Sequence, residues 1–545
     1  MVHYSKLPSI KEPETGLLQF LFSNKFNTSD DKPMLIDALD TSRFLTYAQL
    51  KDSILRFGAG LQDVCGFKSD DVLVLFSYNQ YNYSIPVLGA IAANGATTTA
   101  NPNYNVEELS YQLTQVKAKV IICQKDNIEV ALIAGARAGV PKQNIFIFGD
   151  EQVNGIQPFK KALIRDRKAV LEELSFEEAK AKVAVLCFSS GTTGRSKGVM
   201  TTHANITANT SQFAGFEEGF MDSDTNRMIA VIPLFHIYGL LLLLMYALYL
   251  GIPVYILPRF KIEAFCKVIQ DNKITYAPIV PPICLLLAKS PVISNYDLSS
   301  LKVALSGGSA LSEDLASEAM GKLPGTVIKQ GYGLTETTLF SFSEQTDNKV
   351  RGSSGILAPN LAVKIVDDGG VEVKQGERGE ICIKGPSVMK GYINNPEATA
   401  DCIDKDGYFH TGDIARIDED GNFFIVDRKK ELIKYKGFQV PPAELELILH
   451  KYHAVFECAV IGIYDASKAT ELPTAYVKLK EGLAPSKEIE KEILEYVASQ
   501  VVSYKKLHGV RFIDTIPRGP SGKILRRSLR EAALQENNAP STLKL

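Results

Sequence analysis

The sequence predicts an α/β protein, with a large N-terminal domain of α/β subdomains and a smaller α+β domain at the C-terminus. Its 545 residues exceed what a single hydrophobic core usually organises, so at least two domains are expected. Short apolar segments alternate with helical patterns over most of the chain, which is typical of a largely parallel sheet. A lysine-rich connector then precedes a shorter alternation of strands and helices. We therefore place the domain boundary at residues 428–430, between domains 1–427 and 431–545.

The composition excludes several classes of protein. The 60 basic and 62 acidic residues give a formal net charge of −2, which offers no electrostatic reason for a nucleic-acid partner. The first residues, MVHYSKLPSIKEPETG, lack the apolar core of a secretory signal, so no export is expected. The cysteines are scattered without a C-x-x-C pair, and we expect free thiols in an intracellular protein. They are Cys65, Cys123, Cys187, Cys266, Cys284, Cys382, Cys402 and Cys458.

The segment Ile237–Ile256 is long and apolar enough to raise the alternative of a membrane span. Gly251 and Pro253, however, end any helix after roughly a dozen residues. The Val-Tyr-Ile that follows is typical of a strand. We therefore expect a buried helix followed by a strand and no transmembrane span.

The first 150 residues carry an ordered series of predicted elements. A strand and turn region at 33–46 precedes a helix at 46–61, whose apolar side chains recur at spacings of three and four. The apolar, β-branched run from Val72 predicts a buried strand. After it we expect a helix at 83–94, a loop at 97–105, a helix at 106–115, and strands at 119–124 and around Phe146. These segments indicate a fold and name no reaction.

The stretch Val183–Gly198 joins a predicted buried strand, 183–188, to a loop of small hydroxyl residues and glycines. Glycine lets backbone N–H groups approach an anion closely, and Lys197 adds a mobile positive charge. The pattern is not the Walker loop, since Ser196 stands where that motif needs its second glycine. The alternative is a simple turn. The predicted phosphate-binding residues are Ser189, Ser190, Gly191, Thr192, Thr193, Gly194 and Lys197.

Two later loops follow apolar strands. Pro233 and His236 lie at the end of an apolar run that starts at Met228, a position where open α/β sheets tend to place ligands. A lone histidine is also common as a structural residue, so this signal is weak by itself. Residues 274–283 predict a strand and loop, and 303–306 predict another strand. Gly307 and Gly308 follow, and their backbone can lie flat against a planar ring.

The segment 327–340 places glycines on both sides of an aromatic residue and ends in a threonine and a glutamate. Tyr332 can stack on a purine and Thr335 can donate to a phosphate oxygen. Glu336 supplies the hard oxygen that Mg²⁺ prefers. As an isolated loop the segment also fits a purely structural role.

The last third of the chain has hairpin turns at 367–370 and 418–422. Asp413 can accept hydrogen bonds from two hydroxyls of a ribose, or it is a turn aspartate. A strand ends at Asp427–Arg428, and helices at 443–450 and 486–500 alternate with strands at 457–463, 473–479 and 509–514. Lys523 lies on a glycine-rich loop, from which a mobile ammonium can reach a developing negative charge.

These motifs, in this order, resemble those of the adenylate-forming enzymes, the group that contains acyl-CoA synthetases, 4-coumarate-CoA ligases and firefly luciferases. The resemblance covers about residues 10–535 and rests on five stretches: SSGTTGxxKG from Ser189, PxxHxxG from Pro233, YGxTE from Tyr332, TGD from Thr411, and the stretch from Asp427 to Lys523 with its DRKK, KYKGFQ and SGK segments. Ser196 stands where most members have proline, which removes no phosphate donor.

The resemblance implies a hinge at Lys430, a mobile C-terminal domain, and roles for individual residues. The implied catalytic residues are Lys523, Lys434, His236 and Thr335, and Glu336 is the implied magnesium ligand. To the phosphate loop it adds Gly308, Ser309, Gln330, Gly331, Tyr332, Thr335, Asp413, Arg428 and Lys523 for ATP and AMP. The implied CoA-binding residues are Lys434, Lys436 and Gly437. The implied acyl pocket consists of His236, Tyr238, Gly307, Gly331, Thr337, Thr338 and Leu339.

The function implied is that of an ATP-dependent carboxylic acid–CoA ligase. A carboxylate attacks the α-phosphorus of ATP, and the thiolate of CoA then attacks the acyl-adenylate, with release of pyrophosphate and AMP. We expect a fatty or aryl carboxylate, since the small and apolar pocket residues admit either. The alternatives are a luciferase-like adenylating monooxygenase and a non-catalytic nucleotide-binding protein. The final residues Leu543–Leu545 resemble the tripeptide S-K-L, which predicts peroxisomal import through its receptor and otherwise a cytoplasmic location.

Overall fold

The structure is a computed structural model of the chain. It describes residues 2–189, 196–217, 219–346, 350, 352–435, 438–465, 470–519 and 522–538. Several residues predicted from the sequence lie outside these ranges. They are Ser190, Gly191, Thr192, Thr193 and Gly194 of the phosphate loop, Lys436 and Gly437 of the predicted CoA site, and Leu543 with the rest of the C-terminal tail.

The chain forms two compact units. The larger contains residues 2–363 and 383–410, and the smaller contains 364–382 and 411–545. Residues 364–382 and 411–427 thus pack with the C-terminal part of the chain. The expected functional boundary at 428–430 is a different division, and it stays a prediction.

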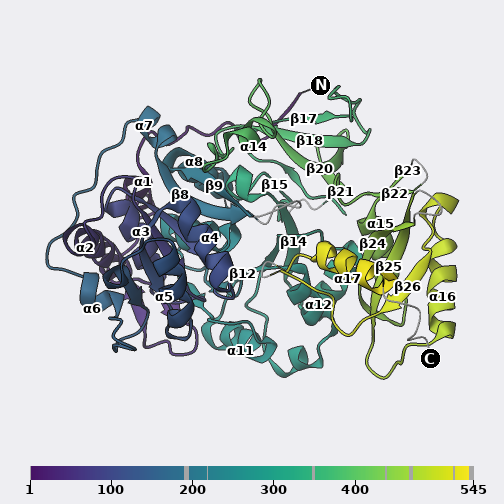
Figure 1. The fold of residues 1–545 in the computed structure, drawn as a ribbon, viewed down its shortest axis with the longest axis horizontal. Helices are drawn as coiled ribbons and strands as arrows, with labels where there is room; N and C mark the ends of the chain where they lie inside the picture. Colours follow the sequence, from purple (N-terminus) through teal and green to yellow (C-terminus); the bar gives the residue numbers. More distant parts are fainter. Residues whose placement is uncertain are drawn as a thin grey trace. The chain divides into compact units, whose positions relative to one another are not determined.

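A seven-stranded sheet forms one half of the larger unit, drawn mainly in purple and blue in Figure 1. All its strands are parallel except the two at one edge, which are antiparallel to their neighbours. Alternate residues of its central strand, Val72, Val74 and Phe76, pack on helices α4 (Val106–Val116) and α5 (Ile128–Arg137). In order, the strands are β19 (Gly391–Tyr392), β9 (Lys197–Thr202), β8 (Val183–Ser189), β5 (Ala96–Ala100), β4 (Val72–Phe76), β6 (Ala118–Cys123) and β7 (Ile145–Ile147).

The prediction of a loop at 97–105 is wrong for its first residues, because Ala96–Ala100 form the buried strand β5 between β4 and β8. Its three threonines resemble a polar loop in the sequence. Each hydroxyl donates to a backbone carbonyl oxygen: Thr97 to Val87 at 2.9 Å, Thr98 to Leu186 at 2.5 Å and Thr99 to Phe235 at 2.6 Å. Buried hydroxyls satisfied in this way cost little, so the β-branched side chains can occupy a central strand.

A nine-stranded sheet forms the other half of the larger unit. Its six central strands, from β14 to β2, are parallel, which confirms the predicted sheet type. In order, the strands are β16 (Ile356–Leu357), β15 (Phe342–Ser343), β14 (Val327–Tyr332), β13 (Val303–Ser306), β12 (Tyr276–Ile279), β10 (Met228–Ala230), β11 (Val254–Ile256), β2 (Pro33–Asp37) and β3 (Phe44–Thr46).

Helices connect these strands. The predicted helix at 46–61 is α2 (Tyr47–Cys65), which Thr46 caps, and the predicted helix at 83–94 is α3 (Ser84–Ala92). The loop expected after β12 is instead helix α12 (Pro281–Lys289), because a proline fits the first turn of a helix. The other helices of this unit are α1 (Leu17–Leu21), α6 (Phe159–Leu163), α7 (Phe176–Ala181), α8 (His203–Phe216), α11 (Ile262–Asn272), α13 (Glu313–Lys322) and α14 (Pro396–Ala400).

The apolar segment 237–256 folds as predicted into a buried helix and a strand. Helix α9 (Ile237–Gly239), the π-helix η3 (Leu240–Tyr246) and α10 (Ala247–Leu250) form one continuous helix. Gly251 ends it with a φ of 70°, and β11 follows. Among the residues that the structure describes, no helix is long and apolar enough to cross a membrane.

The smaller unit combines two sheets and a hairpin. In the first sheet, β17 (Ala362–Val366), β18 (Gly379–Lys384), β20 (Phe409–Ile417) and β21 (Phe423–Arg428) follow in that order, and the predicted turn at 418–422 joins the last two. The second sheet contains β24 (Val455–Asp465), β25 (Thr470–Leu479) and β26 (Gly509–Phe512). The hairpin pairs β22 (Ile433–Tyr435) with β23 (Phe438–Val440), and the helices are α15 (Pro442–His450), α16 (Lys487–Ala498) and α17 (Arg526–Asn538).

The β24–β25–β26 sheet has a hydrophobic core on each face. Cys458 and Val460 of β24 pack with Ile433 of the hairpin and with α15 and α16. The intervening residues, Ala459 and Ile461, pack with α17. The hairpin and α17 therefore cover opposite faces of this sheet. All eight cysteines of the chain lie in described ranges and are free thiols, with only Cys402 partly exposed.

Candidate active site

The loop that carries His236 is held by residues from the neighbouring sheet. Asn79 donates to the carbonyl oxygen of Ile232 at 3.0 Å and accepts from the N–H of Leu234 at 2.8 Å. Thr99 donates to the carbonyl oxygen of Phe235. His236 then caps α9, where its Nδ1 accepts from the N–H of Tyr238 at 3.3 Å. These bonds hold the loop after β10 and place the imidazole at the start of α9.

Three predicted acyl-pocket residues lie together. The hydroxyl of Tyr238 donates to the carbonyl oxygen of Leu305 at 2.7 Å, and burial raises its pKa well above the usual value, so it stays neutral. Its ring lies against Gly307, where an added Cβ would be 3.1 Å from a ring carbon. Leu305 lies close to Gly331 on the next strand, since an added Cβ there would be 3.4 Å from its side chain. A side chain at position 307 would therefore displace the tyrosine ring.

The other predicted pocket residues, on the turn after β14, are placed differently. Thr337 is fully buried, and its hydroxyl exchanges hydrogen bonds with the backbone of Leu334. Thr338 is also fully buried, with a φ of 70° and a hydroxyl that donates to the carbonyl oxygen of Ser387 at 2.6 Å. Leu339 is half-buried. The two threonine hydroxyls thus shape the turn, and the contribution of these residues to the pocket stays a prediction.

The two loops predicted to border adenine are joined to each other. Ser306 pairs with Gln330 on adjacent parallel strands, and the amide oxygen of Gln330 accepts from the N–H of Leu311 at 3.0 Å. Gly308, with a φ of 84°, and Ser309 are exposed at this edge. Tyr332 packs on Phe342 with ring centres 5.3 Å apart. The Tyr332 ring is therefore held in place on the strand that carries Gln330 and Gly331.

The described ends of the phosphate loop face each other, because Ser189 at the end of β8 pairs with Lys197 at the start of β9. The Nζ atom of Lys197 lies 4.8 Å from the ring centre of Tyr392. The hydroxyl of Tyr392 donates to Oε1 of Glu336 at 2.9 Å, and the backbone of Met389 donates to the carbonyl oxygen of Glu336. Tyr392 thus connects the phosphate-loop lysine to the predicted metal ligand.

Sequence reasoning missed Tyr392. It lies on β19, which pairs with β9 through Tyr392 and Val199, so a strand far along the chain borders the phosphate hairpin. Tyr392, Glu336 and Thr335 are all at least nine-tenths buried. The signal in the sequence is the stretch Met389–Tyr392, which contains a tyrosine after a lysine and a glycine but carries no motif that names a partner.

In the smaller unit, the two residues predicted to bind ribose form an ion pair. Asp413 on β20 pairs with Arg428 on β21, and Nε of Arg428 lies 3.1 Å from Oδ1 of Asp413. Asp413 is 3% exposed, and its N–H donates to the hydroxyl of Thr411. Lys429 forms ion pairs with Glu380 and Asp368, each at 3.1 Å. The antiparallel register alone brings the predicted aspartate and arginine together.

Lys523 lies in the electrostatic neighbourhood of that pair. Burial, and then the positive charge of Arg428, lower the pKa of Lys523 to about 8, while Glu431 and Asp413 oppose the shift. Its carbonyl oxygen accepts from the N–H of Gly519 at 2.7 Å in a tight turn, and the following residue, Ile524, packs under α17. A lysine with this pKa holds its proton near neutrality and can lose it in mild base.

The predicted CoA lysine and the hinge residue are both exposed. Lys434 lies on β22, where its N–H donates to Glu471 and its carbonyl oxygen accepts from Thr470. Lys430 lies in the turn after β21. The hairpin of Lys434 and the helix after Lys523 cover opposite faces of one sheet, so the two lysines belong to different faces of the smaller unit.

Two buried residues near the expected hinge were also missed. Asp427 accepts from the N–H of Arg428 at 2.7 Å and of Ala443, at the start of α15, at 3.1 Å. Burial raises the pKa of Asp427 to about 7. Arg526 forms ion pairs with Glu431 and Glu446 at 2.6 and 2.7 Å. These bonds connect β21 to the elements that follow the hinge, and nothing local in the sequence distinguishes them from surface charges.

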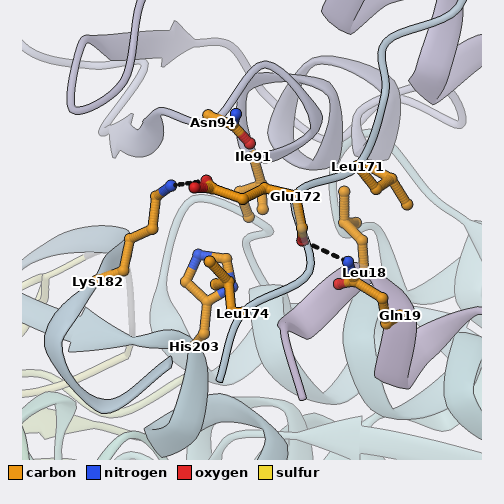
Figure 2. A pocket seen from close by; sticks show the side chains of 9 residues that line it. All are labelled: Leu18, Gln19, Ile91, Asn94, Leu171, Glu172, Leu174, Lys182 and His203. Atoms are coloured by element: carbon orange, nitrogen blue, oxygen red, sulfur yellow. Dashed lines mark hydrogen bonds and ion pairs between the residues drawn. The ribbon is translucent and has the colours of Figure 1, made fainter. Parts of the chain in front are cut away.

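A small cavity lies apart from all the predicted site residues of the larger unit (Figure 2). It has a volume of about 10 Å³, room for roughly one water molecule, among Leu18, Asn94, Glu172, Lys182 and His203. The Nδ1 atom of His203 accepts from the N–H of Leu17 at 3.1 Å, and in the described part of the chain its Nε2 has no partner. Burial lowers the pKa of His203 to about 4. We interpret this cavity as structural.

Comparison with known proteins agrees with this geometry. The model of the AMP-binding enzyme family matches residues 22–393, and that of the AMP-binding enzyme C-terminal domain matches 444–523. The chain belongs to the AMP-binding enzyme family. Among curated members it is 38% identical over 537 residues to 4-coumarate–CoA ligase 3 of Oryza sativa subsp. japonica, covering 97% of this chain and 94% of that protein. It is 37% identical to 4-coumarate–CoA ligase 1 of Petroselinum crispum, covering 97% and 96%.

Two solved structures share the fold of this chain. The ATP-bound MatB of Rhodopseudomonas palustris has a TM-score of 0.85 at 26% identity, covering 95% of this chain and 98% of that one. An anthranilate CoA ligase in complex with anthranoyl-AMP has a TM-score of 0.86 at 24% identity, covering 96% and 98%. The latter likeness, at this identity, concerns the fold alone.

Proposed function

We propose that this chain joins an arylpropenoic acid to coenzyme A at the expense of ATP. The observation that carries the proposal is the 38% identity over 97% of the chain to a protein named 4-coumarate–CoA ligase. The reaction class, AMP-forming ligation of a carboxylic acid to CoA, follows from the family and its curated members. Both curated relatives reported above carry ligase names.

The proposed reaction consists of two half-reactions, and the bonds formed and broken balance in each. In the first, a carboxylate oxygen of the acid forms a bond to the α-phosphorus of ATP, and the bond to the bridging oxygen breaks as pyrophosphate leaves. In the second, the thiolate sulfur of CoA bonds to the acyl carbon, and AMP leaves with the electrons of the acyl–oxygen bond. Negative charge develops on phosphate oxygens in the first step and on the carbonyl oxygen in the second.

The residues of this chain fit those needs. The Asp413 carboxylate, oriented by Arg428, offers acceptors to the two ribose hydroxyls. Lys523, with a pKa of about 8, supplies a positive charge at pH 7 for the first transition state. The Tyr332 ring, held by its contact with Phe342, suits stacking on the adenine ring. The likeness to an ATP-bound relative at 26% identity supports ATP as the nucleotide.

Glu336 fits a role in holding Mg²⁺. Its Oε1 is oriented by Tyr392, and a cation that arrives with ATP needs only one or two protein carboxylates besides the phosphates. When bound, Mg²⁺ offsets charge on the phosphate oxygens. Lys197, placed over the Tyr392 ring, adds a fixed positive charge beside that carboxylate.

The test uses two assays over one panel of acids. ATP–pyrophosphate exchange reports the first half-reaction, and thioester formation with CoA reports the whole reaction. We expect exchange and thioester formation with cinnamic acids at higher kcat/KM than with decanoic or benzoic acid. Exchange with decanoic acid alone would replace the aromatic substrate class by a fatty one. The absence of exchange with every acid would refute the ligase itself.

We further propose peroxisomal import through the C-terminal Leu-Lys-Leu, which lies outside the described residues. A fluorescent protein carrying the last twelve or so residues is expected to concentrate in peroxisomes. A diffuse signal that deletion of those residues leaves unchanged would contradict this.

A further inference from the structure

A buried polar cluster lies behind the predicted acyl pocket, in the larger unit. We define the distal cluster as Glu217, which follows α8, Tyr246 of the π-helix η3, Tyr276 of β12 and Lys329 of β14. The Lys329 and Glu217 side chains are 1% and 0% exposed. Such a pair is costly to bury, and it stabilises a fold less well than apolar residues of similar volume. Its presence therefore calls for a reason beyond stability.

The hydrogen bonds of the distal cluster are incomplete. Lys329 donates to Oε1 of Glu217 and to the hydroxyl of Thr346 at 3.0 Å, and Tyr276 donates to the same Oε1 at 3.4 Å. In the described part of the chain, neither Oε2 of Glu217 nor the hydroxyl of Tyr246 has a hydrogen-bond partner. Both residues are 2% exposed. One acceptor and one hydroxyl are thus buried and unsatisfied, a costly arrangement unless a ligand completes it.

The two unsatisfied groups belong to side chains at the same turn of α8, because Tyr246 packs on Phe213 and Glu217 follows four residues later. Burial, and then the negative charge of Glu217, raise the pKa of both Tyr246 and Tyr276. The Tyr246 ring is held edge-on against Phe213 of α8, with ring centres 4.6 Å apart. Tyr246 is also the last residue of the π-helical segment, a rare conformation that is frequent at functional sites.

The distal cluster shares a face of the sheet with the predicted acyl pocket. Lys329 and Gly331 are two residues apart on β14, so they face the same side, about 7 Å apart along the strand. Lys329 pairs with Leu305, whose carbonyl oxygen holds Tyr238 and whose side chain lies beside Gly331. Tyr238 lies next to Gly307, Tyr276 lies beyond Tyr238, and Glu217 with Lys329 lies beyond Tyr276.

We propose that the distal cluster is the specificity subsite of the acyl pocket and recognises a hydroxyl group at the end of the acid opposite its carboxylate. The substrate hydroxyl donates to Oε2 of Glu217 and accepts from the hydroxyl of Tyr246. The placement of the pocket rests on the proposed function, whereas the chemistry of the subsite rests on the two unsatisfied groups.

The subsite discriminates by chemistry and not by size. The Glu217 carboxylate, paired with Lys329, offers acceptors, so a substrate group with a proton to give completes it. A methyl, methoxy or keto group at the same place leaves Oε2 unsatisfied. Sites built around a hydrogen-bonded hydroxyl reject analogues that lack it far more strongly than apolar pockets reject an added methylene.

The decisive measurement compares acids that differ only at the distal position: 4-hydroxycinnamate, 4-methylcinnamate and 4-methoxycinnamate. We expect the native protein to favour the hydroxyl over the methyl compound by about 10- to 100-fold in kcat/KM, the scale of a hydrogen bond to a charged group. Tyr246→Phe keeps the ring against Phe213 and removes one hydrogen-bond partner, so this ratio is expected to fall several-fold.

A matched control is available in Tyr83, which is fully buried in the same unit with a hydroxyl that likewise lacks a partner. Tyr83→Phe is expected to leave the hydroxyl-to-methyl ratio unchanged. The double variant Glu217→Leu with Lys329→Met removes the ion pair at similar volume, avoids an unpaired buried charge, and is expected to favour the methyl compound. Circular dichroism checks that each variant is folded.

The outcomes separate this inference from the proposed function. A native protein that converts both cinnamic acids at equal rates, or a ratio that Tyr246→Phe leaves unchanged, overturns the subsite and leaves the ligase intact. If no cinnamic acid is converted, the proposed aromatic class fails. The subsite is then tested with alkanoic acids that end in a hydroxyl or a methyl group, and equal rates for that pair overturn it as well.

Discussion

At the scale of single residues, the site depends on side chains whose ordinary properties are altered by their surroundings. Lys523 is the clearest case, because burial and Arg428 lower its pKa to about 8. Tyr392 is another, since its ring contacts Lys197 of the predicted phosphate site and its hydroxyl contacts Glu336, the predicted magnesium ligand. His203 shows the same effect of burial in a place that serves stability. Each case gives a prediction.

Lys523 is expected to set the alkaline limit of adenylate formation. Its charged form is the one that stabilises the transition state, so kcat/KM for pyrophosphate exchange should fall as pH rises through about 8. Lys523→Ala should slow exchange by about 10²-fold or more. In Lys523→Arg, whose guanidinium stays protonated, any remaining activity should continue to higher pH. An alkaline limb at the same pH in Lys523→Arg would assign it to another group.

Tyr392 is expected to act by positioning Glu336. Tyr392→Phe keeps the ring under Lys197 and removes the hydrogen bond, so we expect about a 10-fold lower kcat/KM for ATP and a higher magnesium requirement. Tyr452 is a matched control, because its hydroxyl donates to Glu492 at 2.7 Å in the smaller unit. If Tyr452→Phe changes the magnesium requirement equally, the effect of Tyr392→Phe is one of general stability.

His203 is expected to make the folded state sensitive to acid. Its pKa is about 4 when folded and about 6.5 when unfolded, so between these values the unfolded chain binds the extra proton. The contribution of His203 to the free energy of unfolding is therefore complete above pH 6.5 and falls by about 1.4 kcal/mol per pH unit down to pH 4. Urea unfolding from pH 7 to 5 should show a shallower decline in His203→Gln, and no such change in a variant of the exposed His453.

At the scale of elements, the β24–β25–β26 sheet separates two lysines that the sequence assigns to different steps. The hairpin with Lys434 covers one face and the segment after Lys523 covers the other. A nucleotide pocket that meets one face of this sheet is therefore not expected to meet the other at the same time.

The two half-reactions should consequently respond to different variants. Lys523→Ala is expected to slow pyrophosphate exchange while thioester formation from supplied acyl-adenylate survives. Lys434→Ala and Gln439→Ala should spare exchange and depress CoA transfer. Single-turnover assays of each step measure this directly. Equal loss of both steps in Lys523→Ala and Lys434→Ala would mean that both faces serve one conformation.

At the scale of the whole molecule, the expected hinge is a short exposed turn between two anchored segments. Lys430 is exposed in a turn, between the ion pair of Arg428 and the buried pairs of Arg526. Proline fixes φ and removes an N–H, so Lys430→Pro should stiffen this turn. We expect it to retain pyrophosphate exchange and to lose CoA transfer, as Lys434→Ala does. Normal rates for both steps in this variant would mean that the hinge is not at Lys430.

The sequence by itself determined the features that depend on neighbouring residues. Periodicity predicted α2, β4 and the helix and strand at 237–256, and the loop compositions singled out Lys197, Glu336, Asp413 and Lys523.

The tertiary structure decided the features that depend on which strands are neighbours. Tyr392 donates a hydrogen bond to Glu336, which is 56 residues away in the chain, and Lys329 donates one to Glu217, which is 112 residues away. The threonines of β5 resemble a loop in the sequence because the carbonyl oxygens that accept from their hydroxyls lie in other elements and loops. The order of the strands in the sheets creates such contacts, and no pattern of neighbouring residues in the sequence reveals that order.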